Sequence, residues 1–273
     1  MASPIILCGS LSRWASRLGA TMHQAGYDAL GLDWRYVPFE TDDLAGALAG
    51  MRALGIRGFG ISMPFKLEIM PLLDEVDPVA ARIGAVNTVV NEDGRLIGHN
   101  TDWVGATRAL EEVTPLSGRR VLLLGAGGAA RAVAHGLKER LAEVVICNRS
   151  AERAAALAEE IGGSTRAWSS RSTGDVDVVV NATSLGMADV DPRSPLDGVE
   201  LAEGTVVMDI VYKPLKTALY AEALAAGARA VHGGRMLLHQ AARQFELYTA
   251  GVTEEPAPLE VMDRALVATI GSR

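Results

Sequence analysis

The sequence predicts an α/β protein of two domains, each built around a parallel sheet. Residues 121–150 read as strand, glycine turn, helix and second strand in one run, which is the phosphate-binding half of a dinucleotide-binding fold. The first hundred residues also alternate apolar strands with helices, and this alternation is typical of a second parallel sheet. With 273 residues and 49% apolar side chains, the chain is long enough for two modest hydrophobic cores.

Apolar runs and helical spacing place the elements of both halves. In the N-terminal half we expect strands at residues 4–8, 34–39 and 58–63, with helices at 16–31 and 41–55. Pro64 then opens a short helix, and residues 87–100 have the pattern of a hairpin that turns at Asp93-Gly94. After the glycine turn we expect strands at 144–147, 176–182, 205–211 and 228–231, and helices at 151–161, 235–249 and 259–270.

The glycine turn follows a strand, residues 121–124, that is apolar throughout, as in a central parallel strand covered on both faces. Gly125, Gly127 and Ala130 fill the pattern G-x-G-x-x-G/A, with Gly128 adding conformational freedom. Such a turn needs positive φ, and it lets a pyrophosphate approach the backbone N–H groups at the helix N-terminus. Nucleotide binding is therefore expected here.

The end of the next strand predicts which cofactor binds. An NAD-binding fold usually has Asp or Glu there, which accepts a hydrogen bond from the ribose 2′-hydroxyl. This chain has Asn148, Arg149 and Ser150, with Arg153 one turn later. A guanidinium can pair with a 2′-phosphate, which a carboxylate would repel, so we expect NADP rather than NAD. The alternative is that Ser150 only caps the following helix and both arginines are solvated.

The composition argues against several classes of function. The net charge of −7 comes without a basic run, which argues against nucleic-acid binding, and no apolar stretch approaches the roughly 20 residues that span a bilayer. The N-terminus lacks the pattern of a signal peptide, so the cytoplasm is the expected compartment. Cys8 and Cys147 fall in apolar strands and are expected to be reduced core thiols, and the five histidines show no metal-ligand spacing. Composition leaves both a monomer and a homodimer open.

Three polar clusters outside the glycine turn suggest chemistry. They contain, in order, Ser62 and Lys66, then Asn87 and Asp102, then Tyr212, Gly233 and Gln240. Each has a plain alternative, since Lys66 fits a surface lysine, Asp102 a helix N-cap and Asn87 a turn residue. Oxidation of a secondary alcohol requires loss of a hydride and a proton, and a partly buried lysine beside a carboxylate suits the proton transfer.

The order of these motifs resembles the shikimate dehydrogenase family along nearly the whole chain. Segments that match are GAVNT (84–88), NTD (100–102), GAGGAAR (125–131), NRS (148–150), NATSLGM (181–187) and VYKPLKT (211–217). SMPFK at 62–66 resembles the family's V-T-V-P-F-K, and GGRMLLHQAA at 233–242 resembles its G-x-x-M-L-x-x-Q-A segment.

The resemblance implies an NADP-dependent oxidoreductase that interconverts shikimate, or a close relative, and its 3-dehydro form by hydride transfer. A quinate/shikimate dehydrogenase, an aminoshikimate dehydrogenase and a low-activity dinucleotide-binding paralogue remain open. It also implies a substrate domain at residues 1–103, a Rossmann-type NADP domain at 104–234, and C-terminal helices at 235–273 that pack back on the substrate domain. The implied substrate is a small cyclic hydroxy acid.

The same resemblance assigns residues to roles. Lys66 and Asp102 would be the catalytic pair. Ser62, Asn87, Tyr212 and Gln240 would bind the substrate. The cofactor would be bound by Gly125, Ala126, Gly127, Gly128, Ala129, Arg131, Asn148, Arg149, Ser150, Arg153, Met208 and Gly233.

Two departures from the family pattern concern the substrate. The family has G-x-P-I-x-H-S-x-S-P near its N-terminus, where two serines bind the substrate carboxylate, whereas residues 8–23 here read CGSLSRWASRLGATMH. The candidate serines are Ser10, Ser12 and Ser16. With His23 as the fixed point, Arg17 and Gly19 fall at the serine positions, and Trp103 replaces the glycine that commonly follows NTD. These changes indicate a divergent branch of the family.

Overall fold

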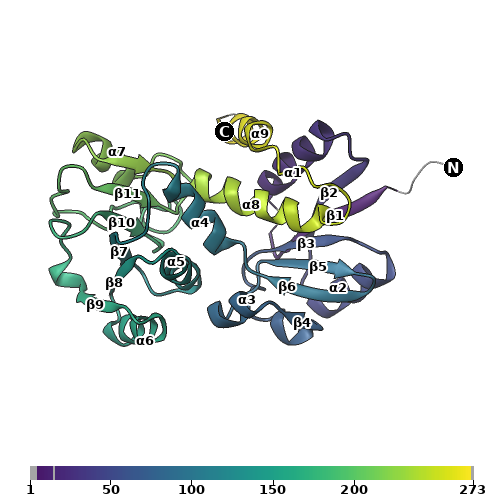
Figure 1. Cartoon of the computed structure of the whole chain (residues 1–273), viewed down its shortest axis with the longest axis horizontal. Coiled ribbons are helices and arrows are strands. Elements are labelled where there is room, and N and C mark those ends of the chain that lie inside the picture. The colour runs from purple at the N-terminus through teal and green to yellow at the C-terminus, as the bar shows by residue number, and fades with distance from the viewer. Residues whose placement is uncertain (1–4, 15, 272–273) are drawn as a thin grey trace. The chain divides into compact units, whose positions relative to one another are not determined.

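The computed structural model describes residues 5–14 and 16–271. The chain divides into two compact units, which we call unit 1 (residues 1–101 and 240–273) and unit 2 (residues 102–239). The domain boundaries expected from the sequence lay after residues 103 and 234. Each unit contains one six-stranded sheet with helices packed against it (Figure 1).

The sheet of unit 1 is mixed. Its strands, in spatial order, are β2 (Trp34–Glu40), β1 (Ile6–Ser12), β3 (Gly58–Ile61), β5 (Thr88–Glu92), β6 (Arg95–His99) and β4 (Glu75–Val76). The first three are parallel, as expected, but β5 is antiparallel to both of its neighbours. The expected parallel strands are therefore extended by the antiparallel hairpin that was also expected. The expected hairpin explains the reversal, since Asp93 and Gly94 both have positive φ, at 52° and 93°, which gives the tight turn between β5 and β6.

Helices cover both faces of this sheet. They are α1 (Arg17–Ala29), α2 (Leu44–Ala53), α3 (Pro78–Ile83), the end of α8 (Gly233–Thr249) and α9 (Leu259–Gly271). Leu11 and Phe59 pack against Leu48 of α2 in one buried cluster. On the other face α8 approaches so closely that a Cβ on Gly58 would lie 2.2 Å from the ring of Tyr248. Only glycine therefore fits at this point of β3.

Two elements of unit 1 differ from the expectation. Strand β1 continues to Ser12 instead of ending at Cys8, and Pro4 lies outside the described residues. The short helix expected from Pro64 is instead a series of turns over residues 63–69, followed by a 3-10 helix, η1 (Met70–Leu72). Its backbone is diverted because the Lys66 carbonyl oxygen accepts a hydrogen bond from the Val86 N–H at 2.9 Å.

The sheet of unit 2 is parallel throughout. Its strands, in spatial order, are β12 (Arg229–Val231), β11 (Val206–Asp209), β10 (Val178–Asn181), β7 (Arg120–Leu124), β8 (Glu143–Asn148) and β9 (Ser164–Ala167). The chain runs outward from β7 to β9 and then resumes on the other side of β7 with β10. This reversal of strand order is where open α/β sheets bind ligands, at the carboxyl ends of the strands.

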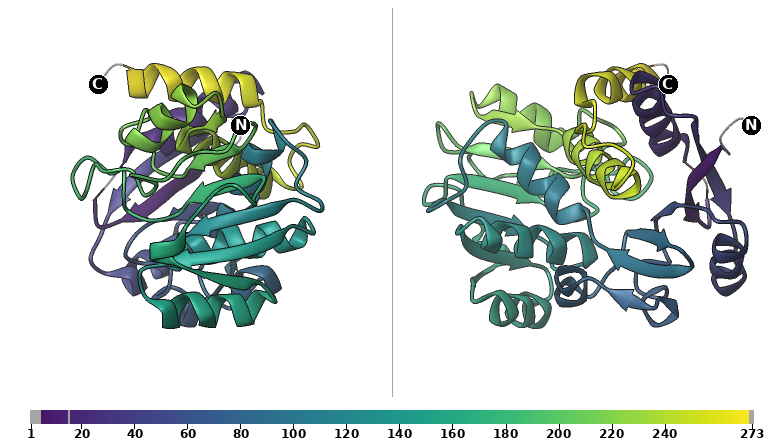
Figure 2. Two further views of the ribbon diagram at one scale, coloured as in Figure 1. Left: turned by 90° about the vertical axis from the view of Figure 1, so that its left-hand side faces the viewer. Right: turned by 45° about the vertical axis from the view of Figure 1, so that its right-hand side comes forward.

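Helices pack against both faces of this sheet (Figure 2). The helices are α4 (Asp102–Glu111), α5 (Gly128–Glu139), α6 (Ala151–Ile161), α7 (Ala218–Ala225) and the start of α8, with a 3-10 helix, η2 (Trp168–Ser170), after β9. Val121 and Leu123 belong to the buried cluster that contains α5, whereas Leu122 and Leu124 belong to the one that contains α7. Both faces of β7 are therefore buried, as its apolar run predicted.

Cys8 and Cys147 are both free and buried, as expected, and burial raises the pKa of the Cys8 thiol to about 12. None of the helices that the structure describes is long and apolar enough to cross a membrane. Within residues 5–14 and 16–271, no group of three or more His, Cys, Asp or Glu side chains could hold a metal ion.

Candidate active site

The glycine turn lies between the end of β7 and the start of α5. Gly125 has a φ of 115°, and a Cβ there would lie 2.8 Å from the Ala182 carbonyl oxygen at the end of β10. Gly127 is the N-cap of α5, and a Cβ on Gly127 or Gly128 would meet nothing within 4 Å. The turn is thus closed on the side of the sheet and open toward the helix N-terminus, where backbone N–H groups bind phosphate.

A hollow of about 590 Å³ opens at this turn, a volume within the usual range of ligand pockets. Five of the residues predicted from the sequence line it: Gly125, Ala126, Gly127, Asn148 and Arg149. A neighbouring hollow of about 500 Å³ shares Asn148 and Arg149 and reaches β9. The pocket thus lies between the glycine turn and the end of β8.

Residues 148–153 are compatible with both alternatives that the sequence left open, a helix cap at Ser150 and a site for a 2′-phosphate. Ser150 caps α6, because its hydroxyl oxygen accepts a hydrogen bond from the Arg153 N–H at 3.3 Å, and the hydroxyl donates to Glu152 at 2.8 Å. The Asn148 side chain donates to the Ser150 carbonyl oxygen at 3.0 Å. The guanidinium groups of Arg149 and Arg153 have no hydrogen-bond or ion-pair partner among the described residues. They remain available to a phosphate.

The other predicted cofactor residues do not line the pocket. Arg131 forms a two-point ion pair with Glu160 of α6, with N···O distances of 2.7 and 2.9 Å. Met208 is fully buried within β11, and a Cβ on Gly233 would lie 2.3 Å from the Ile210 carbonyl oxygen. Gly128, Ala129, Ser150 and Arg153 lie on α5 or α6 or at the first turn of each, outside the lining residues.

Several lining residues were missed in the sequence. They are Trp168, Ala182, Thr183, Ser184, Leu185, Val190, Asp191 and Arg193. Thr183 follows the end of β10, a position that the parallel-sheet rule marks as a ligand site, so its signal was present. Trp168 follows β9, whose sequence STRA is polar and largely exposed, and nothing in its pattern marks a site.

In unit 1 the segment after β3 carries two of the predicted side chains. Ser62 is exposed, and its carbonyl oxygen accepts a hydrogen bond from the Phe65 N–H at 3.0 Å. Phe65 is buried in the core and anchors the turn. Lys66 is half-buried at the start of the diverted backbone. The turn places a lysine directly after the carboxyl end of a parallel strand.

Asn87 is the centre of a buried polar network in unit 1. Its side-chain oxygen accepts hydrogen bonds from the Thr101 N–H at 2.7 Å and the Thr88 hydroxyl at 2.8 Å, and its amide donates to the Thr101 hydroxyl at 3.0 Å. Asn100 donates to the Ala85 carbonyl oxygen at 2.9 Å. The GAVNT and NTD segments therefore lie side by side, as the hairpin predicted.

The C-terminal helix α8 adds a glutamine to this network, but it is not the predicted one. Gln244 is buried, and its amide donates to the Asn87 carbonyl oxygen at 3.1 Å and to the Thr88 hydroxyl at 3.0 Å. Gln240, one turn earlier, is half-buried and contacts neither Asn87 nor Thr88 through a hydrogen bond. The helical spacing of i and i+4 puts both side chains on one face of α8.

Unit 2 holds the remaining predicted residues. Asp102 is buried at the start of α4, and Trp103 follows it under the guanidinium of Arg140, whose carbon lies 5.7 Å from the ring centroid. Tyr212 is half-buried, with the Lys213 ammonium 5.9 Å from its ring centroid. Asp102 thus lies at the first residue of a helix, and Tyr212 in the loop after β11.

A buried carboxylate that was not predicted organises the Tyr212 loop. Asp209 ends β11 and accepts hydrogen bonds from the Thr217 hydroxyl at 2.6 Å and the Val211 N–H at 3.0 Å. It also accepts one from the Asn181 amide at 2.9 Å. Burial raises the pKa of Asp209 despite these donors. The carboxylate ties both ends of the loop to the sheet.

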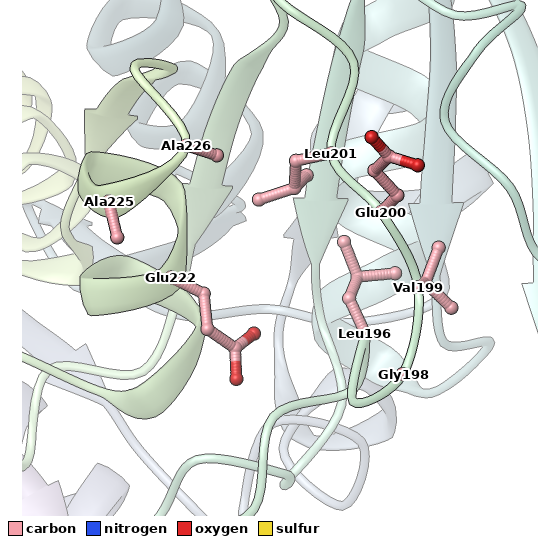
Figure 3. Close-up of a pocket in the computed structure, with 8 residues that line it drawn as sticks. All are labelled: Leu196, Gly198, Val199, Glu200, Leu201, Glu222, Ala225 and Ala226. Carbon is pink, nitrogen blue, oxygen red and sulfur yellow. The ribbon is translucent and has the colours of Figure 1, made fainter.

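A separate hollow of about 480 Å³ lies in unit 2 beside α7 (Figure 3). Glu222 and Ala225 of α7 stand opposite Leu196 and Leu201 of the loop before β11. Its lining is largely aliphatic, and none of the residues predicted for cofactor or substrate belongs to it. This hollow is therefore distinct from the pocket at the glycine turn.

The parallel sheet, its glycine turn and the pocket beside two unpaired arginines define an α/β oxidoreductase of the dinucleotide-binding class. Two family models match the chain: shikimate dehydrogenase substrate binding domain over residues 15–89, and shikimate / quinate 5-dehydrogenase over residues 107–210. The chain belongs to the shikimate dehydrogenase family. The first match begins after β1 and so leaves out Ser10 and Ser12.

Relatives cover almost the whole chain. The shikimate dehydrogenase (NADP(+)) of Methanothermobacter thermautotrophicus is 42% identical over 261 residues, which is 91% of each chain. The crystal structure of shikimate 5-dehydrogenase from Thermus thermophilus, in complex with NADP(H) and shikimate, has a TM-score of 0.86 and 35% identity over 96% of this chain and 99% of that one. The ligand-free 5-ketofructose reductase of a Gluconobacter species has a TM-score of 0.90 and 35% identity, covering 98% of this chain and 100% of that one.

Proposed function

We propose that the protein is an NADP-dependent dehydrogenase that interconverts the secondary alcohol of shikimate, or of a close relative, and the corresponding ketone. The observation that carries this proposal is the pocket at the glycine turn, where Arg149 lines the wall without a partner and no carboxylate ends β8. This arrangement suits a 2′-phosphorylated dinucleotide. The named relatives support the same cofactor and substrate class.

The cofactor, when bound, supplies or accepts the hydride. In our proposal Lys66 donates a proton to the substrate oxygen during reduction and removes it during oxidation. Asp102 is proposed as the carboxylate that orients this lysine. Ser62, Asn87, Tyr212 and Gln240 hold the ring hydroxyl groups of the substrate. Unit 1 is proposed as the substrate-binding part, completed by residues 240–273.

A second candidate is a reductase of neutral polyhydroxy ketones. It is favoured by the three candidate serines, each of which already has a partner within unit 1. The Ser12 hydroxyl donates to the Trp14 carbonyl oxygen at 2.8 Å, Ser16 caps α1 through the Leu18 N–H at 3.4 Å, and Ser10 is hydrogen-bonded to Tyr36. The Ser12 proton is therefore committed to a backbone carbonyl, and only Ser10 and Ser16 remain as candidate donors to a carboxylate in the described part of β1 and α1.

A substrate panel with the purified chain tests both candidates. NADP reduction is measured with shikimate, quinate, aminoshikimate and a carboxylate-free cyclitol, and NADPH oxidation with 3-dehydroshikimate and 5-ketofructose. Higher kcat/KM for the cyclic acids supports the first candidate, whereas a preference for 5-ketofructose supports the second. Nucleotide binding without turnover of any of these compounds would contradict both and indicate a paralogue of little activity.

The expected compartment is the cytoplasm, because free buried thiols such as Cys8 and Cys147 are typical of a reducing environment. The proposal holds for a monomer or a homodimer, and sedimentation of the active protein distinguishes them.

A further inference from the structure

Trp168 stands beside both hollows that contain Arg149. It is the first residue of η2, directly after β9, and its side chain is half-buried against the core beside α7. The larger hollow extends from Trp168 to the glycine turn, and the smaller one extends from Trp168 along β9 to α6. Among the described residues that line these two hollows, Trp168 is the one aromatic side chain.

Arg171 contacts the Trp168 indole and the backbone beside it. Its guanidinium carbon lies 4.7 Å from the Trp168 ring centroid, and it donates hydrogen bonds to the carbonyl oxygens of Trp168 at 2.7 Å and Pro195 at 2.8 Å. Arg171 lines a third hollow with Trp168 but neither of the two that contain Arg149. Arg171 therefore contacts the indole from outside the two hollows that contain Arg149.

The other arginines that line the two hollows are already engaged, and Arg193 pairs with Asp191 at 2.6 Å. Arg166 donates to Asp175 at 2.5 Å and to the Ser172 carbonyl oxygen at 2.7 Å. Arg149 is thus the arginine of these two hollows that has no partner in the described part of the chain. It lines both hollows together with Trp168. A phosphate-binding cation and an apolar aromatic wall side by side suit an adenosine that carries a 2′-phosphate.

We propose that Trp168 is a cofactor-binding residue whose indole stacks on the adenine ring, while Arg149 pairs with the 2′-phosphate of the same adenosine. The inference rests on the proposed dinucleotide function and adds the residue that binds the adenine ring. In a sheet of this topology the adenosine part of the ligand lies beyond the end of the second strand, here β8, on the side of β9. Trp168 directly follows Ala167 of β9, and Ala167 is paired with Asn148 at the end of β8.

The two residues should then respond differently to three ligands. The Kd of NADP, NAD and adenosine 2′,5′-bisphosphate is measured by calorimetry for the wild type and for Trp168→Leu, Trp168→Phe and Arg149→Ala. Loss of stacking should weaken all three ligands by a similar factor, about 5- to 150-fold in Trp168→Leu, because every one contains adenine. Trp168→Phe should restore most of the affinity. Arg149→Ala should weaken only the two ligands with a 2′-phosphate.

Fluorescence gives a readout that does not depend on turnover. Adenosine 2′,5′-bisphosphate should quench part of the tryptophan emission of the wild type, and the quenching should vanish in Trp168→Phe. It should persist in Trp34→Phe, since Trp34 is buried in β2 of unit 1. Far-ultraviolet circular dichroism of each variant establishes that it is folded.

Three outcomes would overturn the inference. Unchanged affinities in Trp168→Leu would show that adenine does not contact the indole. A loss confined to NADP and adenosine 2′,5′-bisphosphate would show that Trp168 acts only by positioning Arg149. Failure of the wild type to bind any of the three ligands would overturn the dinucleotide function itself, which separates that failure from a failure of the stacking assignment.

Discussion

The Gln244 amide nitrogen lies 3.1 Å from the Asn87 carbonyl oxygen, so a residue near the end of the chain completes a network formed by the hairpin of unit 1. The same amide also donates to the Thr88 hydroxyl at 3.0 Å. Because these groups are buried, each hydrogen bond replaces one that water would make in the unfolded chain. The C-terminal part of α8 therefore belongs to unit 1, and its removal would expose polar groups as well as apolar ones.

Gln244→Leu should destabilise the protein, whereas Gln240→Leu should not. The first substitution leaves the Thr88 hydroxyl without a buried donor and should lower the free energy of unfolding by about 1–3 kcal/mol. Gln240 is proposed to hold substrate, so its loss should raise KM and change stability by less than about 0.5 kcal/mol. Urea unfolding and steady-state kinetics of both variants measure the difference. The reverse pattern would assign Gln244 to substrate and Gln240 to the fold.

Local patterns predicted most of the fold because the strands of unit 2 are apolar on both faces. The local patterns failed where a polar segment becomes a strand or a helix because of its contacts with neighbouring elements. Strand β9 (Ser164–Ala167) is a largely exposed edge strand, and its sequence STRA carries no apolar signal. Helix α7 (Ala218–Ala225) was overlooked although Thr217 caps it through the Tyr220 N–H. Strand β1 runs past Cys8 because the polar Ser10 and Ser12 find partners inside unit 1.

In the site, too, features set by consecutive residues were predicted, and contacts between distant residues were not. The glycine turn and Arg149 follow from consecutive residues, and both were predicted. The pairing of Arg131 with Glu160 depends on the packing of α5 against α6, which a motif match does not contain. Trp168 reaches its position because β9 pairs with β8, and Gln244 because α8 packs on the hairpin of unit 1. No spacing rule in the sequence would have selected either residue.

Arg149→Ala should weaken NADP binding far more than NAD binding. Loss of a charge-assisted contact to the 2′-phosphate costs about 1.5–3 kcal/mol, roughly 10- to 150-fold in Kd, and NAD has no phosphate there to lose. Titration calorimetry measures both cofactors. Arg119→Ala is a matched control, since Arg119 pairs with Asp177 at 2.9 Å at the opposite end of β7. Equal NADP affinity in wild type and Arg149→Ala would refute the assignment.

Lys66→Ala should remove most turnover while leaving cofactor affinity nearly unchanged. A group that transfers the substrate proton typically contributes about 10² to 10⁴ in rate, and Lys66 belongs to unit 1 whereas the glycine turn belongs to unit 2. Asp102→Asn keeps the shape of the side chain but removes the charge, so it should also lower kcat. Retention of more than about a tenth of wild-type kcat in Lys66→Ala would indicate a surface lysine instead.

The double variant tests whether Lys66 and Asp102 act on one step. If both serve the same proton transfer, Lys66→Ala with Asp102→Asn should be much less impaired than the product of the two single effects. Stopped-flow measurement of a single turnover isolates the chemical step. Strictly multiplicative losses would mean that the two residues contribute independently, with Asp102 acting mainly on α4.

The protein should lose stability on acidification because of His23. Its ring is wholly buried, donates through Nδ1 to the Gly19 carbonyl oxygen at 2.9 Å and stacks on Tyr36 with centroids 4.3 Å apart. Burial lowers the pKa of His23 to about 4. The unfolded chain binds this proton near the usual pKa of about 6.5, so its uptake favours unfolding. The stability is complete above pH 6.5 and falls toward pH 4, by about 3 kcal/mol in total.

His23→Phe isolates this effect from the carboxylates that titrate in the same range. Phenylalanine keeps a ring against Tyr36 and carries no proton, and His23 Nε2 has no hydrogen-bond partner in the described chain to be lost. The difference in unfolding free energy between variant and wild type, measured in urea at pH 7 and at pH 4.5, should therefore shift in favour of the variant at the lower pH, by about 2–3 kcal/mol. Parallel pH dependence of the two proteins would mean that His23 is protonated in the folded state without penalty.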